Sequence, residues 1–125
     1  MIRVKNKGEN GTYFEQRTGC GSANSYLVLA ATVAAGLDGL KKKIEPGAPE
    51  LVDVSKALEL PKSLGEALDA LSEDNVLVEA LGPAFVRWFC TMKRAEIKAI
   101  HSTEGVPLDD EALLQREREV YMRFL

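Results

Sequence analysis

A carboxylate and a guanidinium, Glu15 and Arg17, are the side chains whose types and spacing suggest chemistry. Two residues apart on a strand, they point to the same face. The carboxylate could bind a divalent metal ion, and the guanidinium could bind an anionic substrate. The alternative is structural, because charged residues on a strand are usually solvated or paired across a hairpin, here with Arg3 or Lys5. A single carboxylate is also a weak magnesium site.

Other catalytic arrangements find little support. The run Gly19-Cys20-Gly21 lacks the downstream glycines or lysine of a nucleotide-binding fingerprint. His101 is the only histidine, and we interpret it as a surface residue near a helix end. Cys20 and Cys90 have no metal-binding spacing, which predicts no structural zinc and a reducing, cytoplasmic compartment. Cys90 is expected in the core, and Cys20 in a turn is either inert or an exposed, reactive thiol.

Composition limits the classes of function. With 125 residues, 46% apolar and 28% charged, the chain has the make-up of one globular domain. Its net charge of −3 argues against nucleic-acid binding, because no basic stripe is available to neutralise phosphates. No secretory signal is visible at the start of the chain. The longest apolar run, residues 26–37, is too short to span a bilayer, so no membrane partner is expected.

The elements that must position the charged pair can be read from the pattern. Residues 2–17 predict a β-hairpin, with Asn10-Gly11 as its turn dipeptide. Residues 23–42 are apolar nearly all round, which predicts a buried helix that is capped by Ser22 or Asn24. Residues 44–61, with three prolines and a glycine, predict a surface loop.

Residues 63–125 predict a helical region. A capping box, Ser63 with Glu66, starts the first helix. A short helix over 76–81 and a longer one from Pro83 to about residue 102 should follow, the latter with Lys93, Arg94, Glu96 and Lys98 on its solvated side. A final helix should run from Asp109 or Asp110 through Tyr121. The fold class is therefore α+β, a hairpin followed by four to five helices.

An isolated hairpin is marginal in water, so this one should belong to a larger sheet. No later segment of the chain reads as a source of further strands. We therefore expect exposed apolar surface, and a chain that self-associates or is stable only within a larger assembly.

The run from Glu15 onward resembles the C-terminal part of the catalytic domain of class I glutamine synthetases, and the likeness covers essentially the whole chain. The residues that carry it are Glu15, Arg17, Ala23-Asn24-Ser25-Tyr26-Leu27, Leu29-Ala30-Ala31, Ala35-Gly36-Leu37-Asp38-Gly39, Lys43-Ile44-Glu45-Pro46-Gly47, Leu60-Pro61-Lys62-Ser63-Leu64-Gly65-Glu66-Ala67-Leu68, Lys93-Arg94-Ala95-Glu96 and Glu119-Val120-Tyr121. The Ala-rich stretch 27–40 looks most like the lengsin branch of the family, which is known from the vertebrate eye lens.

The resemblance implies roles for the charged pair. It implies that Glu15 ligates a catalytic divalent metal ion and that Arg17 holds the substrate glutamate. It further implies a reaction that joins ammonia to glutamate, with ATP and magnesium or manganese as cofactors, if the whole protein is active. No catalytic residue is assigned within this chain, and no cofactor is expected for the chain alone.

Two departures from the family pattern bear on activity. Tyr13 stands where the family usually has an arginine that serves phosphate, and Asn24-Ser25 stands where it usually has Asn-Pro. One hypothesis is therefore a non-catalytic, lengsin-like segment with a structural or chaperone-like role. The resemblance would then imply a ring-shaped homo-oligomer, with intermediate-filament proteins as possible partners. The alternative, favoured by the retention of Glu15 and Arg17, is a segment of an active glutamate–ammonia ligase, whose remaining metal ligands and nucleotide site would lie upstream.

Overall fold

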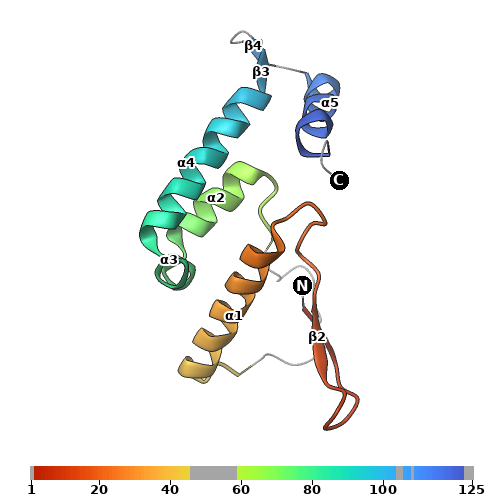
Figure 1. Cartoon of the computed structure of the whole chain (residues 1–125), viewed down its shortest axis with the longest axis vertical. Coiled ribbons are helices and arrows are strands. Elements are labelled where there is room, and N and C mark those ends of the chain that lie inside the picture. The colour runs from red at the N-terminus through yellow and green to blue at the C-terminus, as the bar shows by residue number, and fades with distance from the viewer. Residues whose placement is uncertain (1, 46–58, 104–105, 108, 123–125) are drawn as a thin grey trace.

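The computed structural model describes residues 2–45, 59–103, 106–107 and 109–122. Along the chain, the elements are β1 (Ile2–Lys5), β2 (Tyr13–Gln16), α1 (Ser25–Lys42), α2 (Leu64–Glu73), α3 (Asn75–Leu81), α4 (Pro83–Ile100), β3 (Ser102–Thr103), β4 (Val106–Pro107) and α5 (Asp110–Tyr121) (Figure 1). The predicted α+β class is confirmed, since a two-stranded hairpin precedes five helices. Most of the predicted 44–61 loop lies outside the described residues.

Strands β1 and β2 pair antiparallel, with Arg3 opposite Glu15. The turn is wider than the Asn10-Gly11 dipeptide alone, because β1 ends at Lys5 and β2 begins at Tyr13. Within it Gly11 N donates to Gly8 O at 3.1 Å, and Gly8 has a positive φ of 83°. The side chain of Asn6 closes the turn by accepting from Gly8 N at 3.1 Å and from Thr12 Oγ1 at 3.2 Å. The hairpin is thus held by backbone pairing and local polar contacts.

Helix α1 starts and ends where its sequence signals place it. Asn24, rather than Ser22, is the cap, and its Oδ1 accepts from the backbone N–H groups of Tyr26 and Leu27. At the other end Lys43 takes the left-handed conformation with φ of 52°. The prediction of a buried helix is wrong for the chain as it stands, because none of the residues of α1 is buried. Among the described helices and strands, α3 is the one that packs against α1.

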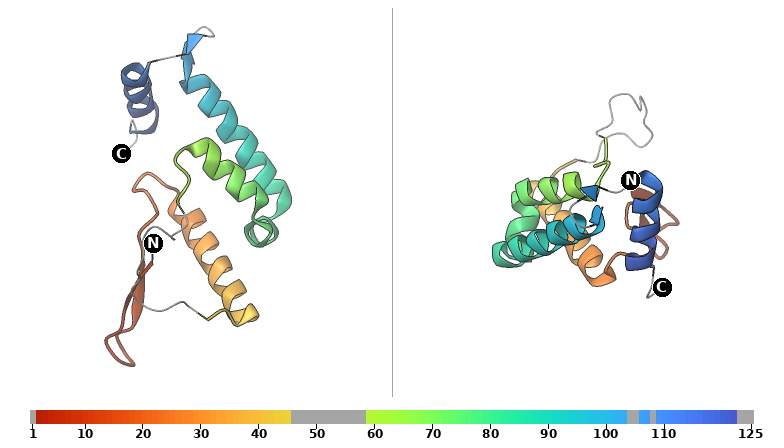
Figure 2. Two further views of the ribbon diagram at one scale, coloured as in Figure 1. Left: turned by 180° about the vertical axis from the view of Figure 1, so that it is seen from behind. Right: turned by 90° about the horizontal axis from the view of Figure 1, so that it is seen from above.

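The core lies between α2 and α4. Leu68 of α2, with Val86 and Cys90 of α4, forms the buried cluster, and α3 packs beside it (Figure 2). The predicted Ser63 cap at the start of α2 is confirmed, since Ser63 Oγ accepts from Glu66 N. The Glu66 carboxylate accepts from Lys62 N, one residue before the cap, so the reciprocal half of the capping box is displaced by one residue. Pro83 occupies the first turn of α4, as predicted.

Helix α5 lies to one side of the α2–α4 layer and is fixed by its last residue (Figure 1). The hydroxyl of Tyr121 donates to the carboxylate of Glu96 at 3.3 Å, and Lys93 Nζ lies 2.7 Å from the same oxygen. Lys93 Nζ also stands 5.7 Å from the centre of the Tyr121 ring. The prediction that Lys93 and Glu96 lie on the solvated side of α4 is therefore wrong, because both side chains are half-buried beneath α5.

The hairpin does not pack closely on α1. A cavity of about 650 Å³ lies between them, lined on the hairpin side by Ile2, Val4 and Phe14. All three side chains remain more than half exposed. In the described part of the chain no helix is long and apolar enough to cross a membrane. The short strands β3 and β4, which pair with each other after α4, were not predicted.

Removal of the central core side chain should cost far more than removal of an exposed leucine. We predict that Leu68→Ala lowers the free energy of unfolding by about 2–5 kcal/mol, because it leaves a cavity between α2 and α4. Leu114→Ala on α5 is the matched control, since Leu114 is 48% exposed and Leu68 is 2% exposed. Urea denaturation followed by circular dichroism measures both. Equal losses for the two variants would contradict a core centred on Leu68.

Candidate functional site

The charged pair singled out from the sequence is brought together on the hairpin. Glu15 Oε2 accepts from Arg17 Nη2 at 2.6 Å and from Arg17 Nε at 3.1 Å. Arg17 lies just beyond the end of β2, and its side chain turns back along the strand to reach the carboxylate. Across the hairpin, Arg3 Nη1 stands 4.0 Å from the same oxygen. The structural alternative is observed, because Glu15 pairs with Arg17 and with Arg3 across the hairpin. The binding of a metal ion and an anionic substrate stays a prediction.

The cations around Glu15 hold its carboxyl ionised. The hydrogen bond from Arg17 lowers the pKa of Glu15, and the positive charges of Arg17, Arg3 and Lys5 lower it further. Loss of solvation raises the pKa of Glu15 and offsets part of this effect, but the pKa remains lowered. The side chains of Glu15 and Arg17 are 33% and 39% exposed, so this pair contributes little to stability by itself.

The described residues do not complete a metal site around Glu15. No group of three or more His, Cys, Asp or Glu side chains comes together in the part of the chain that the structure describes. The Glu15 carboxylate, the one on the two paired strands, already accepts two hydrogen bonds at one oxygen from the Arg17 guanidinium. A hard divalent cation usually needs several oxygen ligands, and one engaged carboxylate does not supply them. Any metal at this position would therefore need ligands from beyond the described residues.

Tyr13 stands on the hairpin next to this face, opposite Lys5 in the strand register. Its side chain is 47% exposed, and Lys7 Nζ lies 5.9 Å from the centre of its ring. The ring accepts this cation through its π face and offers no fixed positive charge of its own. The strand therefore carries a neutral aromatic side chain two residues before Glu15.

The turn after β2 is ordered by one side chain. Gln16 Oε1 accepts from Thr18 N at 2.6 Å and from Gly19 N at 3.2 Å. The sequence left open whether Cys20 is inert or an exposed, reactive thiol. In the structure Cys20 is exposed, and its sulfur lies 3.0 Å from Ser22 Oγ. That hydrogen bond lowers the pKa of the Cys20 thiol. The turn thus leads directly from the charged strand to the cap of α1.

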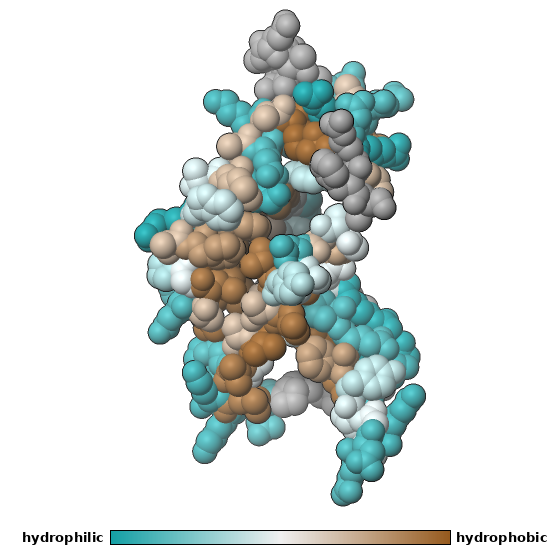
Figure 3. All heavy atoms as spheres, viewed as in Figure 1, coloured by the Kyte–Doolittle hydropathy of each residue, from teal (hydrophilic) through white to brown (hydrophobic). Residues whose placement is uncertain are grey.

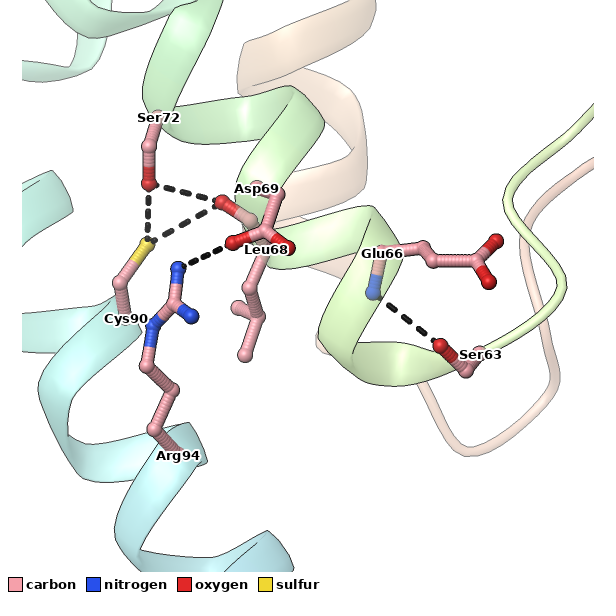
Figure 4. A network of polar contacts seen from close by, with 7 residues as sticks. All are labelled: Ser63, Glu66, Leu68, Asp69, Ser72, Cys90 and Arg94. Carbon is pink, nitrogen blue, oxygen red and sulfur yellow. Dashed lines mark hydrogen bonds and ion pairs between the residues drawn. The ribbon is translucent and has the colours of Figure 1, made fainter.

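The remaining sequence candidates are structural (Figure 4). Cys90 is buried as predicted, and its sulfur lies 3.5 Å from Ser72 Oγ. Arg94 of α4 binds Asp69 of α2 at 2.7 Å, an ion pair that the sequence pattern did not indicate. His101 is exposed and caps the C-terminal end of α4.

The partial burial of Tyr121 was not predicted from the sequence. Burial raises the pKa of Tyr121, and the adjacent Glu96 carboxylate raises it further. No pattern in the sequence pairs Tyr121 with Glu96, because the two residues lie on different helices and their contact depends on where α5 packs.

Comparison with known proteins decides the family. The model of the glutamine synthetase catalytic domain matches residues 1–106 of the chain. The chain belongs to the glutamine synthetase family. No solved structure matches it.

The relatives that this chain resembles include lengsin, a glutamine synthetase and a gamma-glutamylanilide synthase. Lengsin from Homo sapiens is 46% identical over 102 residues, which cover 78% of this chain and 20% of lengsin. The glutamine synthetase of Pyrococcus horikoshii is 40% identical over 134 residues, covering 97% of this chain and 30% of that enzyme. The gamma-glutamylanilide synthase of Acinetobacter sp is 34% identical over 133 residues, covering 100% of this chain and 26% of that protein. This chain therefore spans between about a fifth and a third of the relatives' lengths.

The pairing of Glu15 with Arg17 should be visible as a shift in titration. We predict that the Glu15 carboxyl titrates below the usual range of glutamate, and that Arg17→Gln moves its pKa back up. Arg3→Gln is the matched control and should move it less, because Arg3 stands 4.0 Å away and donates no hydrogen bond to the carboxylate. Carboxyl carbon shifts in an NMR titration report each pKa directly.

The sign of the stability effect follows from the direction of the shift. Because folding lowers the pKa of Glu15, its pairing with Arg17 stabilises the folded state at pH values above the unfolded pKa. This stabilisation is lost as the pH falls through the lower, folded pKa. An unchanged titration in Arg17→Gln would show that the hydrogen bond does not set the pKa.

Proposed function

We propose that this chain is the C-terminal segment of a glutamine-synthetase-like catalytic domain that serves a non-catalytic, structural or chaperone-like role in an oligomeric, cytoplasmic assembly. The observation that carries the proposal is Tyr13. The family resemblance calls for a phosphate-binding arginine at this position, and the strand instead presents a neutral ring. Phosphoryl transfer depends on fixed cations that stabilise the transferring group, so this replacement removes one of them. The 46% identity to human lengsin agrees with this reading.

Within this proposal, Glu15 and Arg17 keep the family's metal and glutamate positions, respectively, without serving catalysis here. The carboxylate of Glu15 is directed at Arg17 rather than at a cluster of further acidic groups in the described residues. If bound, a magnesium or manganese ion would supply charge stabilisation for the phosphoryl group of ATP. Among the described residues, the chain would contribute to such a site the Glu15 carboxylate and the Arg17 guanidinium, which lie on one face of the hairpin.

The alternative is a segment of an active ATP-dependent glutamate–ammonia ligase. The retained pair Glu15 and Arg17 favours it, as does the 40% identity to the Pyrococcus horikoshii glutamine synthetase over nearly the whole chain. The residues that precede this segment in a longer protein would discriminate. Intact metal-binding glutamates and phosphate-binding arginines there would favour the ligase, and their loss would favour the non-catalytic role.

The chain itself should not bind nucleotide. We predict that ATP with magnesium, at millimolar concentration, leaves its melting temperature unchanged, because the hairpin offers no fixed phosphate-binding arginine at Tyr13. The Pyrococcus horikoshii enzyme is the positive control in the same thermal-shift assay. A ligand at 100 times its dissociation constant stabilises a protein by about 2.7 kcal/mol, so binding would be easy to see. A reproducible, magnesium-dependent rise in the melting temperature would contradict the proposal.

A further inference from the structure

The turn after β2 is ordered by a side chain that binds the backbone on the far side of Arg17. Gln16 Oε1 accepts from Thr18 N at 2.6 Å and from Gly19 N at 3.2 Å. Strand β2 ends at Gln16, so Arg17 lies just beyond the strand pairing that fixes the residues before it. The two hydrogen bonds span Arg17, and they fix its backbone where the strand no longer does.

Gln16 itself faces away from the charged pair. Side chains alternate along a strand, and Gln16 lines the hollow between the hairpin and α1 together with Phe14. Glu15 lies on the other face, where it pairs with Arg17 and Arg3. Neither hydrogen bond of Gln16 Oε1 involves the side chain of Glu15 or Arg17. An influence of Gln16 on the pair must therefore pass through the backbone of the turn.

The contact between Arg17 and Glu15 requires a directed side chain. Both Nε and Nη2 of Arg17 donate to the same carboxylate oxygen, at 3.1 Å and 2.6 Å. Because Nε lies close to the aliphatic stem, this side-on approach allows few directions of the arginine Cα–Cβ bond. The backbone of Arg17 sets that direction, and the hydrogen bonds of Gln16 fix that backbone.

Arg17 lies on a polar, partly exposed surface. Hydrophilic atoms cover most of the hairpin, at the lower right of the space-filling view (Figure 3). The side chain of Arg17 is 39% exposed. An exposed arginine loses side-chain entropy when it is held in one geometry, which weakens most surface ion pairs. When Gln16 has already fixed the backbone, only the side chain of Arg17 remains to be ordered.

The same pattern of hydrogen bonds also occurs at two helix starts. There, one side-chain oxygen accepts from the backbone N–H groups two and three residues later: Asn24 from Tyr26 and Leu27, and Asp74 from Val76 and Leu77. Those side chains cap α1 and α3. The bonds of Gln16 start no helix, since α1 begins only at Ser25. They order instead the turn that contains Arg17.

We propose that Gln16 is a positioning residue for Arg17. By binding the backbone that follows Arg17, its side-chain carbonyl turns the guanidinium back onto Glu15 in the side-on geometry. Gln16 thus determines how this face presents its cation. The inference goes beyond the proposed function and does not rest on it, because it concerns how the pair is held and not whether the pair serves catalysis.

Titration of Glu15 by NMR in variants of the 125-residue chain tests the proposal. Gln16→Leu removes the acceptor but keeps a similar size beside a mostly apolar hollow, so the strands should stay paired. We expect it to raise the Glu15 pKa by at least about half of the rise that Arg17→Gln causes, because the guanidinium is no longer held side-on. Gln16→Asn should restore the low pKa, because an asparagine makes the same pattern of bonds at Asn24.

Asn6→Ala is the matched control, since Asn6 closes the turn at the other end of the hairpin through its own side-chain oxygen. This variant should leave the Glu15 pKa where it is, whereas a general loosening of the hairpin would raise it. The Arg17 Nε–H signal gives a second readout. Its slow exchange with water, expected in the unaltered chain and in Gln16→Asn, should be lost in Gln16→Leu.

An unchanged Glu15 pKa in Gln16→Leu would overturn the proposal, as would an equal rise in Asn6→Ala or in Gln16→Asn. Strand pairing is checked in each variant by nuclear Overhauser effects between Arg3 and Glu15, which stand opposite each other. Their loss in Gln16→Leu would show that Gln16 holds the hairpin rather than Arg17, and would overturn the proposal too. None of these measurements involves catalysis, so the proposed function can fail while the positioning role stands.

Discussion

The packing of α4 against α2 is the contact on which the rest of the structure depends. Among the described residues, Leu68, Val86 and Cys90 meet there, and Ile100 is the only other buried hydrophobic side chain. The Ser72 hydroxyl, which lies near Cys90, donates to the Leu68 carbonyl, so the polar groups beside this core are satisfied (Figure 4). Because so little apolar surface is buried elsewhere, most of the stability that burial provides should come from this half of the chain.

The position of the core has consequences for the candidate site. The pair Glu15 and Arg17 lies on the hairpin, which is held by strand pairing and by turn contacts from Asn6 and Gln16 rather than by a core. A catalytic group must be held within fractions of an ångström, and a two-stranded hairpin over an open cavity does not provide that rigidity. The hairpin therefore has the properties of one part of a larger sheet, and α1 exposes several of its apolar side chains. Both features fit a chain that spans a fraction of its relatives' lengths.

Local signals predicted the elements well, because capping and proline chemistry act over a few residues. Asn24, the Ser63 cap and Pro83 all stand where they were expected. Periodicity also identified the apolar faces, but it could not show whether a partner covers them, and α1 was wrongly expected to be buried. The prediction that Glu96 lies on a solvated face was wrong for a related reason, because the exposure of its side chain depends on where α5 packs. At the site, spacing predicted that Glu15 and Arg17 share a face. Whether that face supports catalysis depends on ligands from beyond the described residues, which the spacing of two side chains cannot reveal.

A chimera of an active relative tests the non-catalytic role of this segment most directly. The matching part of the Pyrococcus horikoshii glutamine synthetase would be replaced by this chain, and γ-glutamyl transfer would be measured with manganese. We expect a chimera that assembles like the parent enzyme but has lost most of its transfer activity, and a partial recovery in the same chimera with Tyr13→Arg. A chimera that retains activity comparable with the parent enzyme would contradict the non-catalytic role, because the segment with Tyr13 would then be competent for catalysis.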